Sequence, residues 1–124
     1  MNRVTGIGGI FFKAKDPESL REWYRQHLGI KLEAWGGSVM FTNIGEKNPG
    51  YQIWSVFPSE DEYFSPGKAD FMINYRVDDL KALLAVLKEE GCEVDERIEE
   101  GEKGLFGWVT DPEGNRIELW EPSV

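Results

Sequence analysis

Two stretches of the chain, residues 9–33 and 72–95, share one order of apolar, polar and turn positions. In both, a run with strand-like alternation precedes an acidic residue, an amphipathic pattern of helical spacing and a glycine. Each stretch therefore predicts a strand, a helix, a stop and a further strand. Similarity at this distance along a chain indicates two copies of one supersecondary unit.

The predicted helix ends have local causes. An aspartate before the first helical residue offers an oxygen to a free backbone N–H, and proline at the first position loses no hydrogen bond. A glycine after the last turn accepts the left-handed conformation that ends a helix. These residues are Asp16, Pro17 and Gly29 in the first unit, and Asp78 or Asp79 and Gly91 in the second.

Short strands are expected after each helix, separated by turns at Gly36-Gly37 and at residues 111–115. Their approximate bounds are residues 30–35, 38–44 and 50–57 in the first unit, and 92–98, 104–110 and 115–121 in the second. The segment between the units contains Tyr63 and Phe64, so we expect it to pack against the rest of the protein. The chain thus predicts one α+β domain over residues 1–124, with a first module at about 5–58, a linker at 59–69 and a second module at about 70–122.

Alternation along four of the strands separates an apolar face, which we expect the helices to cover, from a mixed face. The apolar face receives Ile10, Phe12, Ala14, Tyr51, Ile53, Phe71, Ile73, Tyr75, Val77, Ile117 and Leu119. The mixed face receives Gly9, Phe11, Lys13, Gln52, Trp54, Met72, Asn74, Arg76, Arg116, Glu118 and Trp120. A concave face of this composition is typical of a small-molecule pocket, and the alternative is packing against another sheet or subunit.

Charge restricts the partners. The 23 Asp and Glu residues against 14 Lys and Arg give a formal charge of −9, which disfavours nucleic-acid binding. The acidity fits solubility, or else attraction of a cationic ligand. Eight acidic residues lie between Glu89 and Glu102, as expected for a solvated hairpin edge.

No long apolar stretch or signal peptide is evident, so we expect no membrane span and a cytoplasmic location. The single cysteine, Cys92, has no intramolecular disulfide partner, which fits a reducing compartment.

A family resemblance follows from three features. The paired units, Trp23-Tyr24 followed by Leu28-Gly29, and the run Asp-Pro-Glu-Gly-Asn-Arg-Ile-Glu-Leu at residues 111–119 resemble the vicinal oxygen chelate superfamily. This superfamily includes glyoxalase I, extradiol dioxygenases and the fosfomycin and bleomycin resistance proteins. The resemblance implies two βαβββ modules that form a cupped, partly open mixed sheet with helices on its outer face. It also implies a homodimer.

In metal-dependent members, four positions bind one divalent ion, and the resemblance places them at Gly9, Gln52, Met72 and Glu118. Glycine has no side chain and methionine is a soft ligand, so only Gln52 and Glu118 remain as donors to a divalent metal, which they would hold weakly. The only histidine, His27, is expected on the outer surface of the first helix. We therefore expect no cofactor, with a divalent metal as the weaker alternative.

Three functions remain open. The first is metal-independent binding of a small molecule, as in the bleomycin resistance branch. Its ligand would contact the mixed face, and the tryptophans, which alternatively serve core packing, would stack on it. These tryptophans are Trp35, Trp54, Trp108 and Trp120.

The second function is an enzyme, such as a lyase, epimerase or dioxygenase, with Glu118 as the base or as a residual metal ligand. The apolar surroundings of Trp54, Met72 and Trp120 would raise the pKa of Glu118. Gln52 and Asn74 would hold a carbonyl group of the substrate. The alternative role for Glu118 is a salt bridge to Arg76, Arg116 or Lys13. The third function is an interaction module without a ligand.

Overall fold

The computed structural model describes residues 3–41 and 50–123. In this part of the chain, two helices and eight strands follow one another. Neither helix is long and apolar enough to cross a membrane. In chain order the elements are β1 (Val4–Ala14), α1 (Pro17–Leu28), β2 (Ser38–Phe41), β3 (Tyr51–Pro58), β4 (Phe71–Val77), α2 (Leu80–Glu89), β5 (Glu93–Val94), β6 (Glu99–Gly101), β7 (Gly104–Thr110) and β8 (Arg116–Pro122).

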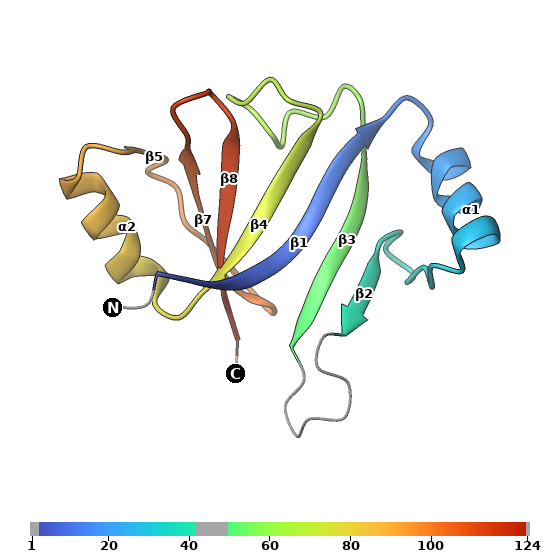
Figure 1. Cartoon of the computed structure of the whole chain (residues 1–124), viewed down its shortest axis with the longest axis horizontal. Coiled ribbons are helices and arrows are strands. Elements are labelled where there is room, and N and C mark those ends of the chain that lie inside the picture. The colour runs from blue at the N-terminus through green and yellow to red at the C-terminus, as the bar shows by residue number, and fades with distance from the viewer. Residues whose placement is uncertain (1–2, 42–49, 124) are drawn as a thin grey trace.

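The strands form one mixed sheet in the order β2-β3-β1-β4-β8-β7-β5, with β6 paired to β7. The pairs β1–β3 and β4–β8 are parallel, whereas β1 and β4 are antiparallel and join the two units. Figure 1 shows the curved sheet with α1 and α2 at its opposite ends. Both helices pack on the same face of the sheet, which leaves the other face as the inside of a cup. The predicted α+β class and cupped sheet are therefore confirmed.

Both helices begin and end where their sequence signals lie. Asp16 Oδ1 accepts a hydrogen bond from the Ser19 N–H at 3.1 Å, and Asp79 Oδ1 accepts one from Ala82 at 3.1 Å. Gly29 ends α1 with a φ of 69°, in the left-handed region that glycine tolerates. The buried side of α2 packs on the sheet in a core of Val77, Leu80, Leu83, Leu84 and Leu119.

The strand predicted at residues 30–35 is wrong. The chain turns there instead: the Gly36 N–H donates to the Glu33 carbonyl at 2.9 Å, and the Glu33 N–H donates to the Gly37 carbonyl at 2.7 Å. This turn prevents the segment from running alongside β2 as a further strand. Residues 42–44, the predicted end of the next strand, lie outside the described residues. The strand predicted at 92–98 is shorter, because only Glu93–Val94 pair with β7 before β6 begins at Glu99.

The segment between β3 and β4 packs inward, as its aromatic residues predict. Phe64 is 1% exposed, and Tyr63 stacks on Phe57 with ring centres 5.5 Å apart. The turn at residues 111–115 is also confirmed, with both the Glu113 and Asn115 N–H groups donating to Asp111 Oδ1 at 2.9 Å. The aromatic contacts attach the segment to the sheet, and the Asp111 hydrogen bonds close the turn of the last hairpin.

Candidate ligand pocket

Strand pairing decides which side chains face the inside of the cup. Gly9 of β1 pairs with Asn74 of β4, and Asn74 pairs with Glu118 of β8. Paired residues lie on the same face of a sheet, so all three belong to the inner face. The predicted faces of β1, β4 and β8 are correct.

The predicted face of β3 is wrong. Trp54 pairs with Ile10, and its ring centre is 5.1 Å from that of Tyr24 on α1, which places Trp54 on the outer face. Gln52, two residues away, shares that face, and its Nε2 donates to the Ile7 carbonyl at 3.3 Å. The inner face of this strand instead carries Ile53 and Tyr51, whose ring centre is 5.3 Å from that of Trp120, and both were predicted to face a helix.

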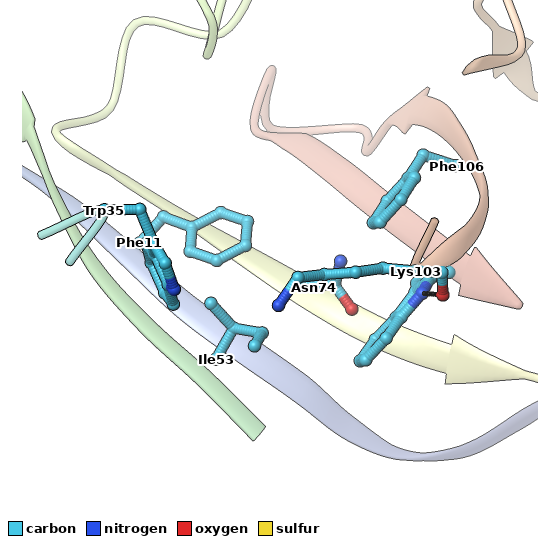
Figure 2. Close-up of a pocket in the computed structure, with 7 residues that line it drawn as sticks. Phe11, Trp35, Ile53, Asn74, Lys103 and Phe106 are labelled. Carbon is cyan, nitrogen blue, oxygen red and sulfur yellow. Dashed lines mark hydrogen bonds between the residues drawn. The ribbon is translucent and has the colours of Figure 1, made fainter. Parts of the chain in front are cut away.

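A pocket of about 180 Å³ opens on the inner face, between the two halves of the sheet. Figure 2 shows its side chains converging from several strands and two loops. Of the predicted site residues, Phe11, Asn74 and Trp120 line it. Trp35, expected only as a stacking residue, lines it as well. The prediction missed Ile53, Lys103 and Phe106.

The walls of the pocket are aromatic and held in place by the backbone. The Phe106 ring lies parallel to Trp120, with 5.9 Å between ring centres and 2° between planes. Trp120 Nε1 donates to the Lys103 carbonyl at 2.8 Å, which ties this wall to the β6–β7 turn. On the opposite side, the Trp35 ring lies directly over Gly37, where an added Cβ would be 2.0 Å from the ring. Gly37 is therefore required for the position of Trp35.

Besides Glu118, four predicted site residues lie on the inner face without lining the pocket. Met72 and Trp108 are each 0% exposed in the core beneath it. The Arg76 guanidinium lies 5.2 Å from the Trp120 ring centre and donates to the Tyr51 carbonyl at 2.8 Å. Gly9 allows close packing, since a Cβ there would be 2.7 Å from the Ile53 carbonyl oxygen.

One polar atom in the pocket wall lacks a partner. The Asn74 side chain is 1% exposed, its Nδ2 donates to Glu118 Oε1 at 3.1 Å, and its Oδ1 has no hydrogen-bond partner among the described residues. Oδ1 lies next to Gly8, where a Cβ would be 2.2 Å from it and 2.8 Å from Trp120. A buried acceptor without a donor is rare in folded proteins and requires a physical explanation.

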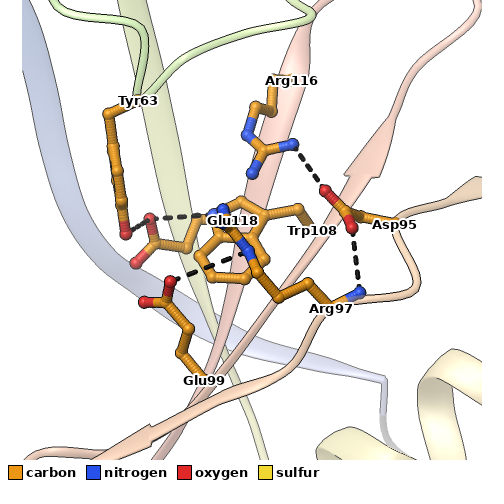
Figure 3. Close-up of polar contacts among 7 residues, drawn as sticks. All are labelled: Tyr63, Asp95, Arg97, Glu99, Trp108, Arg116 and Glu118. Carbon is orange, nitrogen blue, oxygen red and sulfur yellow. Dashed lines mark hydrogen bonds and ion pairs between the residues drawn. The ribbon is translucent and has the colours of Figure 1, made fainter.

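Behind Asn74, the Glu118 carboxyl is 1% exposed and held by three donors. Besides Asn74, Tyr63 donates its hydroxyl to Oε2 at 2.9 Å and Trp108 donates Nε1 to Oε2 at 3.3 Å (Figure 3). Burial raises the pKa of Glu118 to about 7, although these hydrogen bonds and the charge of Arg116 oppose the shift. Burial, followed by the charge of Glu118, also raises the pKa of Tyr63.

The salt bridge considered for Glu118 does not form among the described residues. Arg116 instead donates to Asp95 Oδ2 at 3.1 Å and lies 4.9 Å from the Trp108 ring centre, with Arg97 4.8 Å from the same ring (Figure 3). A backbone hydrogen bond from Arg97 and the pairing with Arg116 lower the pKa of Asp95. The two arginines thus hold Trp108 in place, and Glu118 depends on neutral donors.

The residues at the expected metal positions do not fit a divalent ion. Gly9 and Met72 supply no hard donor, Gln52 is on the outer face, and both Glu118 oxygens accept hydrogen bonds from the protein. The described residues contain no group of three or more His, Cys, Asp and Glu side chains that could hold a metal. His27 is exposed on α1, as predicted.

Comparison with known proteins identifies the family to which this fold belongs. The family model described as a glyoxalase-like domain matches residues 9–120. The chain belongs to this family. The resemblance to the vicinal oxygen chelate superfamily, drawn from the sequence, is thereby confirmed. No curated protein matches the chain.

Several solved structures share the fold of this glyoxalase-like protein. Methylmalonyl-CoA epimerase from Mycobacterium tuberculosis is 22% identical, with a TM-score of 0.63, and the match covers 100% of this chain and 92% of the epimerase. A Streptomyces coelicolor methylmalonyl-CoA epimerase variant in complex with 2-nitronate-propionyl-CoA is 17% identical, with a TM-score of 0.68 and coverage of 98% and 99%. A Legionella pneumophila protein described as an NAD-dependent benzaldehyde dehydrogenase is 12% identical, with a TM-score of 0.59 and coverage of 93% and 98%. At these identities the matches show the fold alone.

Proposed function

We propose that this glyoxalase-like protein binds a small, flat molecule in the inner-face pocket. The observation that carries the proposal is that Asn74 Oδ1, in a wall that is otherwise mostly aromatic, has no hydrogen-bond partner in the part of the chain that the structure describes. Leaving such an acceptor unsatisfied costs about 1–3 kcal/mol, which a donor on a bound molecule would recover. Apolar walls with a few convergent polar groups are the usual composition of a ligand site.

Binding is proposed to need no divalent metal. The support is the donor set described above, in which Glu118 is the only inner-face carboxylate at the expected metal positions and is already held by Tyr63, Trp108 and Asn74. Elemental analysis of the purified protein and titrations with and without EDTA test this. A stoichiometric metal, or a ligand affinity that EDTA abolishes, would overturn it.

Phenol and anisole make a matched pair of probes for the pocket itself. Both carry one aromatic ring, and only phenol has a hydroxyl that donates to Asn74 Oδ1. We expect phenol to bind more tightly in calorimetric titrations, and Phe106→Ala to weaken both probes by removing one wall. Trp54→Phe, on the outer face, is the control. Equal binding to wild type and Phe106→Ala would contradict the proposed site.

Proton abstraction by Glu118 is the second candidate, favoured by the pKa of about 7 that burial gives this carboxyl. A base with a pKa near the working pH transfers protons efficiently. The fold is shared with methylmalonyl-CoA epimerases, and one of them was solved with methylmalonyl-CoA. In this chain, Asn74 lies between Glu118 and the pocket. A substrate would therefore have to displace the hydrogen bond from Asn74 Nδ2 to reach Glu118 Oε1.

Deuterium exchange tests this second candidate. Methylmalonyl-CoA incubated with the protein in D₂O would lose its α-proton signal in NMR spectra if Glu118 removes that proton. Glu118→Gln keeps the shape of the side chain and removes the base, so it should abolish the exchange. Exchange that persists in Glu118→Gln would exclude Glu118 as the base.

The remaining alternatives have less support. An interaction module without a ligand would need a cup filled by its own aromatic side chains, whereas a volume of about 180 Å³ remains between them. A cationic ligand, as in the bleomycin resistance branch, would meet Lys103 at the pocket. The acidic stretch at residues 89–102 is largely exposed, and its strand β6 lies along a hairpin edge.

A further inference from the structure

We propose that the pocket selects an aromatic or conjugated anion, and that Lys103 Nζ is the group that recognises its negative charge. This inference rests on the proposed function and names the chemical class of its ligand. Three observations lead to it: the fixed backbone position of Lys103, the absence of an acidic partner for it among the described residues, and the size and charge of the pocket.

The backbone of Lys103 is fixed in the β6–β7 turn. Its carbonyl accepts hydrogen bonds from Trp120 Nε1 at 2.8 Å and from the Ser123 N–H at 2.9 Å. The side chain therefore starts from a defined point at the edge of the pocket. Figure 2 shows it extended across the pocket toward Trp35, and the residue remains exposed to solvent at this edge of the site.

The ammonium of Lys103 contacts a ring instead of a carboxylate. Nζ lies 5.3 Å from the centre of the Trp35 ring. The sequence neighbours Glu100 and Glu102 are exposed, and neither forms an ion pair with Lys103 within the described residues. The cations that form ion pairs there are Arg3, Arg25, Lys88, Arg97 and Arg116. In a chain with a formal charge of −9, Lys103 thus keeps its ion-pairing capacity for another partner.

The contact with Trp35 is a weak one that an anion can improve on. A cation over an exposed ring gains little, whereas a hydrogen bond between two charged groups is among the strongest in proteins. Trp35 lies in the turn that Glu33, Gly36 and Gly37 close, and its side chain is 50% exposed, so a change of its rotamer would let an anion approach Lys103 while the backbone stays in place. The same ring then covers the bound molecule.

Size and charge define the rest of the ligand. A cavity of about 150 Å³ accepts benzene, so the volume of about 180 Å³ here holds one ring with a small substituent. The Arg76 guanidinium behind Trp120 adds positive charge on the same face. The nearest buried acid, Glu118, faces Asn74, Tyr63 and Trp108 rather than Lys103. The pocket therefore favours a single-ring anion over a cation.

Three probes of nearly one shape test the inference: 4-hydroxybenzoate (anionic), 4-hydroxybenzamide (neutral) and tyramine (cationic). Isothermal titration calorimetry at low salt should give the wild type at least a tenfold preference for the anion over the amide, with tyramine weakest. Lys103→Met keeps most of the unbranched side chain and removes its charge, so it should abolish this preference while the amide binds as before. Lys81→Met, on the exposed side of α2, is the matched control and should keep the preference.

The outcomes separate the two proposals. Equal affinity of the wild type for the anion and the amide, or a preference that survives in Lys103→Met, would overturn the inference about Lys103. If Phe106→Ala still weakened the probes in that case, the proposed pocket would stand. Failure of all three probes to bind the wild type at millimolar concentration would overturn the pocket and the ligand class together.

Discussion

Asn74 connects the pocket to a buried acid. Its Nδ2 donates to Glu118 Oε1 at 3.1 Å, while its Oδ1 lies beside Gly8 without a partner among the described residues. The amide orientation follows from this bond, because an ionised carboxylate only accepts hydrogen bonds. The protonation of Glu118 and the polarity of the pocket wall are therefore coupled through one side chain.

The raised pKa of Glu118 predicts a stability that depends on pH. Its ordinary value is 4.5 and the folded value is about 7, so between these the folded state binds more protons than the unfolded state. Unfolding free energy should therefore fall by about 3 kcal/mol as the pH rises from 4.5 to 7, and then level off. The pKa values of Asp95 and Asp111 are lowered from 3.8, so these residues change the pH dependence of stability only below pH 4.5.

Urea unfolding across this pH range checks the prediction. Glu118→Gln should flatten the dependence, because the amide does not titrate. His27→Gln removes the only histidine, which is exposed, and should leave the dependence unchanged. A flat profile for the wild type would contradict the raised pKa of Glu118, because the folded and unfolded states would then bind the same number of protons.

Two glycines of β1 provide a matched test of the space around Asn74. An added Cβ at Gly8 would be 2.2 Å from Asn74 Oδ1, whereas at Gly6 nothing lies within 4 Å. We expect Gly8→Ala to cost about 1–3 kcal/mol by overpacking and to displace Trp120. Gly6→Ala should be neutral or slightly stabilising. Chemical denaturation and probe binding measure both effects, and equal behaviour of the two variants would contradict the close packing at Gly8.

The helix ends, the last turn and the faces of β4 and β8 could be predicted from the sequence, because their causes are local. Asp16 and Gly29 set the ends of α1 through hydrogen bonds within one turn, and Asp111 forms its turn in the same way. The alternation in β4 and β8 separates a helix-covered face from a polar one, so Asn74, Glu118 and their neighbours could be assigned to the cup. Local chemistry and binary pattern agree at these positions.

The errors arose where the pattern is ambiguous or the cause is distant. In β3, Ile53 and Trp54 are both large and apolar, so alternation does not decide which faces inward; the pairing of Ile53 with Gly9 does. Phe106 could have been predicted, since it lies two residues before Trp108, which was itself predicted as a ligand contact, and therefore shares its face of β7. Lys103 was not, because its position depends on a hydrogen bond from Trp120, 17 residues away.

The hydroxyl of Tyr63 should matter most when Glu118 is ionised. It donates to Oε2 at 2.9 Å, and Tyr63→Phe leaves that oxygen only the longer bond from Trp108. We expect a loss of about 1–3 kcal/mol at pH values near 8 and a smaller loss near pH 5. Tyr75→Phe, under α2, is the control, since its hydroxyl has no hydrogen bond among the described residues. Urea unfolding at both pH values would reject the prediction if the two losses were equal.

Trp54 and Trp120 should respond differently to the same substitution, because they lie on opposite faces of the sheet. Trp120→Phe removes the hydrogen bond that fixes Lys103 and part of the stack on Phe106, so 4-hydroxybenzoate should bind about tenfold more weakly. Trp54→Phe reduces the contact with Tyr24 and should cost about 1 kcal/mol of stability while affinity stays within about twofold. Calorimetric titration and urea unfolding of both variants measure this contrast. The Trp54 side chain lies on the outer face, away from the pocket. An equal loss of affinity in Trp54→Phe and Trp120→Phe would therefore show that the binding site lies elsewhere.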